Sequence, residues 1–172
     1  MFAKLLTTAS LAALLVACGR IDDPSLLDTP RSTLPEGLAG RWFTGTLSTI
    51  QYYDRNTGEF HDPSGSGFYY VFDERGSYET GAVIDSTVAG CTMRLLGREI
   101  GTVTLQAQKL TRHRAFVRTQ VSNDCGHSAV SERGAAVEEM EWSVEADPQS
   151  GQEMLTITDP EFGASRYRRW TE

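Results

Sequence analysis

The sequence has few residues of the kinds that enzymes use for catalysis. Three histidines and three cysteines occur among 172 residues, and there is no Gly-x-Ser-x-Gly, His-Glu-x-x-His or phosphate-binding glycine loop. His61, His113 and His127 lie far apart in the sequence, which is typical of exposed loop histidines. Glu139 and Glu141 share a strand face that we expect to point to solvent. We therefore expect no catalytic residue, no cofactor and no enzymatic activity.

Positive charge is also scarce. The chain carries 16 basic and 23 acidic residues, a formal net charge of −7. Nucleic-acid binding favours basic surfaces, and no basic stretch is longer than Arg112-His113-Arg114 or residues 166–169. We interpret the acidity as a solubility feature and expect no nucleic-acid partner.

No apolar stretch is long enough to span a membrane. The longest runs from Leu5 to Val16 after a single Lys4, and about 12 residues is short of the roughly 20 that a spanning helix needs. The run ends in Leu15-Val16-Ala17-Cys18, with small residues directly before a cysteine. This stretch resembles the lipobox of bacterial lipoproteins. The alternative is an ordinary secretory signal with a chance cysteine.

The lipobox resemblance implies how the protein is processed and where in the cell it is located. Residues 1–17 would be a signal peptide removed by cleavage before Cys18, whose thiol carries a diacylglycerol and whose amine is acylated, for example with palmitate. Gly19, not aspartate, follows the cysteine. By the sorting rule of such lipoproteins this implies the outer membrane, with the domain facing the periplasm of the cell envelope.

Two cysteines remain once Cys18 is assigned to lipidation. In an oxidising compartment we expect Cys91 and Cys125 to form a disulfide bond. A metal site is the alternative, with Asp124 and His127 nearby, but the spacing matches no known set of metal ligands. We therefore expect no bound metal.

The chain divides into a linker and one domain. Residues 18–37 contain half of the six prolines and show no apolar periodicity, which predicts a flexible tether. Residues 38–172 are long enough for a single domain with a core of its own.

The sequence of the domain predicts a series of short strands. Apolar Val103, Leu105 and Ala107 alternate with polar residues, and no long amphipathic helix occurs. Turn signals, including one at 111–114, separate the strands every eight to twelve residues or so, and 135–139 could start a short helix. This pattern is typical of an antiparallel sandwich or barrel. The strand candidates are 44–53, 68–72, 77–84, 99–108, 115–121, 140–146, 154–158 and 165–170.

Gly40-x-Trp42 at the start of the domain, the antiparallel strands and a basic residue in the last strand resemble the lipocalin-like (calycin) barrels. The resemblance implies an all-β, up-and-down barrel of about eight strands. Gly40 would let the chain enter the barrel and Trp42 would plug it. An arginine from the last strand would pack across the indole; the candidates are Arg166, Arg168 and Arg169.

Aromatic residues come from many strand candidates, and they would either fill a barrel or line a ligand cavity. Tyr167 and Arg169 share a face of the last strand, and a buried arginine needs an acidic partner or an anionic ligand. We therefore expect a module that binds a small apolar or amphipathic ligand, such as a fatty-acid-like carboxylate, through Tyr167 and Arg169. The alternative is a protein-interaction module with a filled core, an inhibitor of an envelope enzyme or an accessory subunit. The aromatic residues of this set are Trp42, Tyr52, Tyr53, Phe68, Tyr69, Tyr70, Phe72, Tyr78, Phe116, Trp142 and Tyr167.

Overall fold

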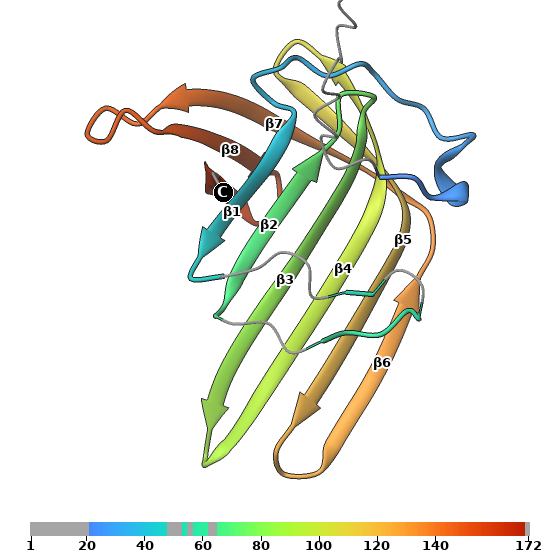
Figure 1. Ribbon diagram of the computed structural model, residues 1–172, viewed down its shortest axis with the longest axis vertical. Helices are drawn as coiled ribbons and strands as arrows, with labels where there is room; N and C mark the ends of the chain where they lie inside the picture. Colours follow the sequence, from blue (N-terminus) through green and yellow to red (C-terminus); the bar gives the residue numbers. More distant parts are fainter. Residues whose placement is uncertain (1–20, 48–52, 55–56, 62–64, 171–172) are drawn as a thin grey trace, which may run out of the picture.

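A computed structural model describes residues 21–47, 53–54, 57–61 and 65–170 (Figure 1). Cys18 and Tyr52 lie outside these residues. Within these residues the regular structure consists of β-strands and one 3-10 helical turn at Pro24–Leu26. The strands are β1 Gly40–Gly45, β2 Gly67–Phe72, β3 Ser77–Val88, β4 Cys91–Gln106, β5 Lys109–Asn123, β6 His127–Arg133, β7 Ala136–Ala146, β8 Glu153–Asp159 and β9 Gly163–Arg169.

Eight of the strands close into an antiparallel barrel, as the sequence predicts. The hydrogen-bonded order is β4-β3-β2-β1-β9-β8-β7-β5, and β4 also pairs with β5 to complete the circle. Trp42 lies opposite both Tyr70 and Arg169, so β1 joins the first and last parts of the chain. This architecture is compatible with the lipocalin-like barrels.

β6 is the extra strand, and it creates a second part of the molecule. β7 pairs with residues 109–114 of β5, whereas β6 pairs with residues 117–123 on the same edge. β3, β4, β5 and β6 therefore continue past the barrel as a sheet, which occupies the lower half of Figure 1. We call this sheet the extension.

The barrel is filled at its upper end. Trp42, Tyr78, Val103 and Leu155 are each fully buried in the main core, and Leu38 of the preceding segment packs with them. A smaller core of Leu47, Tyr69, Val83 and Leu96 lies on the outer face of the sheet, and Phe60 from the β1–β2 connection packs against it.

Part of the segment predicted to be a tether lies against the barrel. Leu26 and Leu34 are buried, and the Thr102 hydroxyl donates a hydrogen bond of 2.6 Å to the Pro30 carbonyl. The Ser32 hydroxyl accepts a hydrogen bond from the Leu105 amide. Isolated leucines between prolines have no periodicity, so the sequence pattern does not indicate this packing.

Two local predictions were wrong, and the structure decides one alternative that the sequence left open. The turn predicted at 111–114 lies within β5, because the chain reverses earlier, at Ala107, which has a φ of 54°. The strand expected at 44–53 ends at Gly45. Residues 136–146 form β7, so no helix begins at Ala135.

The disulfide between Cys91 and Cys125 is confirmed. Cys91 begins β4 and Cys125 lies in the turn between β5 and β6, so the bond joins the tips of two hairpins at the far end of the extension. Because the two sulfur atoms are bonded to each other, neither thiolate is free to bind a metal.

Candidate functional site

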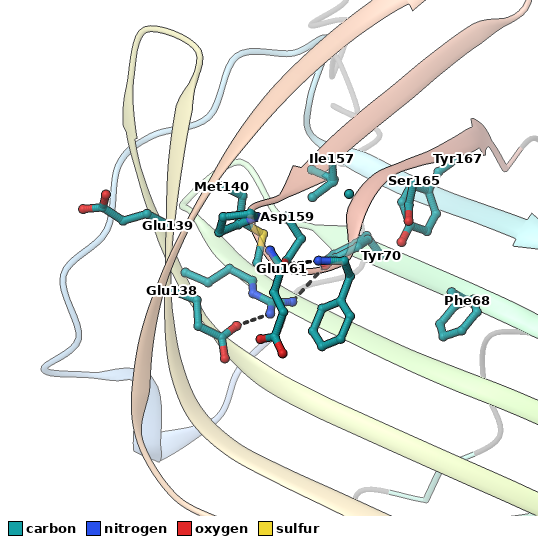
Figure 2. Close-up of a pocket in the computed structure, with 14 residues that line it drawn as sticks. Phe68, Tyr70, Glu138, Glu139, Met140, Ile157, Asp159, Glu161, Ser165 and Tyr167 are labelled. Carbon is teal, nitrogen blue, oxygen red and sulfur yellow. Dashed lines mark hydrogen bonds and ion pairs between the residues drawn. The ribbon is translucent and has the colours of Figure 1, made fainter.

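A cavity of about 630 Å³ opens at the lower end of the barrel. Its lining residues include Phe68 at the start of β2 and the residues of the β8–β9 turn, which lie around its mouth (Figure 2). It is therefore the hollow end of an otherwise filled barrel. The lining residues are Phe68, Tyr70, Arg112, Glu138, Glu139, Met140, Ile157, Asp159, Pro160, Glu161, Phe162, Gly163, Ser165 and Tyr167.

Apolar and aromatic side chains form most of the inner wall. The rings of Tyr70 and Tyr167 meet edge to face with their centroids 5.3 Å apart. Met140 and Ile157 are buried beside them, and Phe162 in the β8–β9 turn is 82% exposed at the mouth. A pocket with such walls suits the apolar part of a small ligand.

A group of charged and phenolic side chains forms one side of the cavity. Arg112 of β5 donates a hydrogen bond of 2.9 Å to the Tyr70 hydroxyl and forms an ion pair with Glu138 of β7 (Figure 2). The Glu99 carboxylate lies 3.6 Å from both Arg112 and Arg114. Two arginines thus face two glutamates, and we call these four residues with Tyr70 and Tyr78 the polar cluster.

The strand register explains why the polar cluster forms. Arg112 lies opposite Glu138 in the β5–β7 pair, and Gly101 lies opposite both Tyr78 and Arg114. Since alternate residues of a strand point to one face, all of these side chains enter the barrel. The Tyr78 hydroxyl donates a hydrogen bond of 2.6 Å to Glu99, which completes the cluster.

Burial changes the acid–base properties of these groups. It raises the pKa of Tyr70, and burial together with the neighbouring Glu99 raises that of Tyr78. Burial lowers the pKa of Arg112, but Tyr70 and Glu99 outweigh this effect and raise it above its ordinary value. Both phenols therefore stay neutral and Arg112 stays charged at physiological pH.

Tyr167 lines the cavity, as the sequence hypothesis requires, but Arg169 does not. The Arg169 guanidinium lies 4.2 Å over the ring of Trp42 at the closed end of the barrel. It donates hydrogen bonds to the carbonyls of Gly37 and Ala39 and pairs with Glu153 at 2.6 Å. The acidic partner that a buried arginine needs is therefore present without a ligand. A ligand-binding role for Tyr167 and Arg169 stays a prediction.

Among the three candidates for the arginine on the indole, the structure selects Arg169. Arg168 packs on the outer side of the barrel, 4.3 Å over the ring of Phe43, and the side chain of Arg166 is 56% exposed. Gly40 has a φ of 131°, and a Cβ atom there would lie 2.6 Å from Nη1 of Arg169. Glycine at position 40 thus makes room for the arginine.

The sequence did not point to Arg112 and Glu138, which line the cavity, or to Glu99, which lies 3.6 Å from Arg112 behind them. The signal was present: Leu110, Arg112 and Arg114 alternate with polar residues, as in a strand with one face inside a barrel. The basic run was instead interpreted as a turn. Buried arginines break the apolar alternation on which strand assignment depends.

Comparison with protein-family models, with curated proteins and with solved structures gives no match. Within the described part of the chain, no helix has the length and apolar character needed to cross a membrane. The function must therefore be argued from the cavity itself.

Proposed function

We propose that this protein is an envelope lipoprotein whose barrel binds a small apolar or amphipathic ligand. The observation that carries the proposal is the cavity of about 630 Å³, walled by aromatic and aliphatic side chains at the open end of the barrel. Its volume lies within the range of small-molecule sites. A protein-interaction module with a filled core has no need of such a cavity, so the cavity favours the ligand-binding candidate.

The charges of the polar cluster favour a ligand with an uncharged polar group, and they disfavour a ligand with a carboxylate. Arg112 is already paired with Glu138 and lies near Glu99. Asp159 and Glu161 add negative charge at the mouth. A bound carboxylate would meet this acidic surface, whereas a hydroxyl can accept and donate hydrogen bonds without a charge penalty.

Binding can be tested on the full-length chain with two probes of equal chain length, decanol and decanoate. We expect saturable binding of decanol, followed by displacement of a fluorescent apolar dye, and weaker binding of decanoate. If neither decanol nor decanoate binds saturably, the ligand-binding proposal is refuted.

A matched pair of variants on β9 locates the binding site. Ser165 lines the cavity, whereas Ala164 pairs with Thr158 and points outward from the barrel. We expect Ser165→Trp to fill part of the cavity and weaken decanol binding at least tenfold, and Ala164→Trp to leave it unchanged. Equal effects of the two variants would place the bound probe elsewhere.

Lipid anchoring is the second half of the proposal, and its support is the Leu15-Val16-Ala17-Cys18 stretch. Cells grown with labelled palmitate should incorporate the label into the protein, and Cys18→Ser should abolish both labelling and cleavage. Unchanged labelling of Cys18→Ser would contradict the anchor.

A further inference from the structure

The two faces of the extension differ in chemistry. Charged residues lie on its outer face, where Arg94 pairs with Asp85 at 2.8 Å and Arg118 pairs with Glu132. These pairs connect β3 with β4 and β5 with β6. Beyond the smaller core that contains Val83 and Leu96, the outer face of the extension therefore carries paired charges, as an ordinary solvated surface does.

The inner face of the extension, which continues the inside of the barrel, instead carries a group of apolar residues, with Ser86, Thr119 and Asn123 on the same face. Ile84 and Leu95 lie opposite each other on β3 and β4, and Leu95 also lies opposite Val121 of β5. Met93 and Val117 occupy the same face. Ile84 is 38% exposed and Met93 is 43% exposed. We call these five residues the apolar strip.

Within the described part of the chain, the strands that close the barrel end before they reach the strip. β7 pairs with β5 only as far as Arg114, and the β8–β9 turn reaches the cavity mouth. In Figure 1 no labelled strand crosses behind the extension. The strip is therefore an open apolar surface of the kind that marks a binding site.

The strip is continuous with the cavity. Phe68 lines the cavity and is 44% exposed, and it lies opposite Ala82, two residues before Ile84 on the same face of β3. From the row of Phe68 to Met93 the strip extends about 13 Å along the strands, at roughly 3.3 Å per residue. The disulfide holds the two hairpins together at the far end.

We propose that the ligand is a long-chain lipid whose chain is longer than the cavity and continues along the apolar strip. This inference rests on the proposed ligand binding and adds the length of the ligand and the surface that receives it. The end of the molecule inside the barrel contacts Tyr70, Tyr167 and Ile157. The remaining methylenes cover Ile84, Leu95 and Met93, which are otherwise in contact with water.

The test compares decanol with hexadecanol on the full-length chain. A fully buried methylene strengthens binding about fourfold, and a methylene on an open surface by less. We expect hexadecanol to bind at least tenfold more tightly than decanol. We expect Met93→Glu and Ile84→Glu to remove most of this difference while decanol binding remains unchanged.

Val130→Glu is the matched control. Val130 is 51% exposed on β6 but lies opposite Gln120 on the outer face, so its substitution should not alter either affinity. Thermal unfolding of each variant confirms that it is folded.

Three outcomes separate the two proposals. If decanol does not bind the wild-type chain, the ligand-binding function is refuted. If decanol binds but the preference for hexadecanol is the same in Met93→Glu, the strip does not receive the chain. If the wild-type chain instead forms dimers that Met93→Glu dissociates in sedimentation experiments, the strip is covered by a second copy and the inference is overturned.

Discussion

Arg169 connects several segments of the chain at the closed end of the barrel. Its guanidinium contacts the Trp42 ring, two carbonyls before β1 and Glu153 at the start of β8. These contacts tie together three segments that are distant in the sequence. The side chain is 24% exposed, and its hydrogen bond to the Ala39 carbonyl is partly buried.

We therefore expect Arg169→Ala to lower the free energy of unfolding by roughly 2 kcal/mol, because a cation–π contact and charged hydrogen bonds are lost. Decanol affinity should not change, since Arg169 does not line the cavity. Arg166→Ala, whose side chain is 56% exposed, is the control and should change stability by less than about 0.5 kcal/mol. Denaturant unfolding and dye displacement measure the two properties. Weaker binding with unchanged stability would instead support the ligand-binding role predicted from the sequence.

The buried tyrosines predict how stability depends on pH. Burial raises the pKa values of Tyr70, Tyr78 and Tyr167 above the ordinary value of 10.0. Since the unfolded chain ionises first, their contribution is complete below pH 10 and is lost as the pH rises above it. We expect phenolate absorbance to show a late step that coincides with alkaline unfolding. A native titration that matches the one in denaturant would contradict this expectation.

At the residue scale, the sequence predicted the structural residues better than the cavity residues. Gly40, Trp42 and an arginine of the last strand were identified from a local motif. The partners Arg112, Glu99 and Glu138 come from three strands and meet only through register. One sequence does not reveal which strands pair, so the polar cluster could not be assembled from it.

At the scale of elements, β4 shows that tertiary packing can maintain a strand at residues with low strand propensity. The strand runs unbroken through Gly97 and Gly101, although glycine in the interior of a strand weakens it. A Cβ atom on Gly101 would lie 2.3 Å from the His113 carbonyl oxygen and 2.7 Å from the Tyr78 ring. A Cβ atom on Gly97 would have no neighbour nearer than 3.9 Å. Gly101 therefore makes space for Tyr78, whereas Gly97 has no such role.

This contrast gives a matched pair of variants on one strand. Gly101→Ala should lower the free energy of unfolding by roughly 2 to 3 kcal/mol, because the backbone or Tyr78 must shift to admit the methyl group. Gly97→Ala should be neutral or stabilising by up to about 1 kcal/mol, because alanine has less conformational freedom in the unfolded chain. Denaturant unfolding of both variants is the measurement. Similar losses at the two positions would contradict the role assigned to Gly101.

For the whole molecule, alternating patterns and turn signals predicted an antiparallel sandwich or barrel, and the lipocalin-like resemblance implied a barrel of about eight strands, whereas neither indicated the extension. In β6, Ala129 and Val130 are adjacent among polar residues and show no apolar alternation, so the pattern of residues 127–133 does not indicate a strand. The strand exists because the hairpin with β5 supplies its hydrogen bonds. The cavity mouth is likewise a product of the assembled fold, since its residues come from both ends of the domain.

The division into a barrel and an extension leads to a prediction about cooperativity. The main core lies in the barrel, while the tips of the extension are joined by the Cys91–Cys125 bond across 34 residues. Replacing both cysteines with serine should lower the free energy of unfolding by up to roughly 4 kcal/mol, because the unfolded chain gains freedom. The loss of protection from hydrogen exchange should be concentrated at residues 84–95 and 120–130, since few buried contacts hold these tips. Strands β1, β2 and β8, which enclose the core, should keep their slow exchange. Uniform acceleration across the barrel and the extension would mean that the disulfide supports the whole core, and that the two parts do not differ in stability.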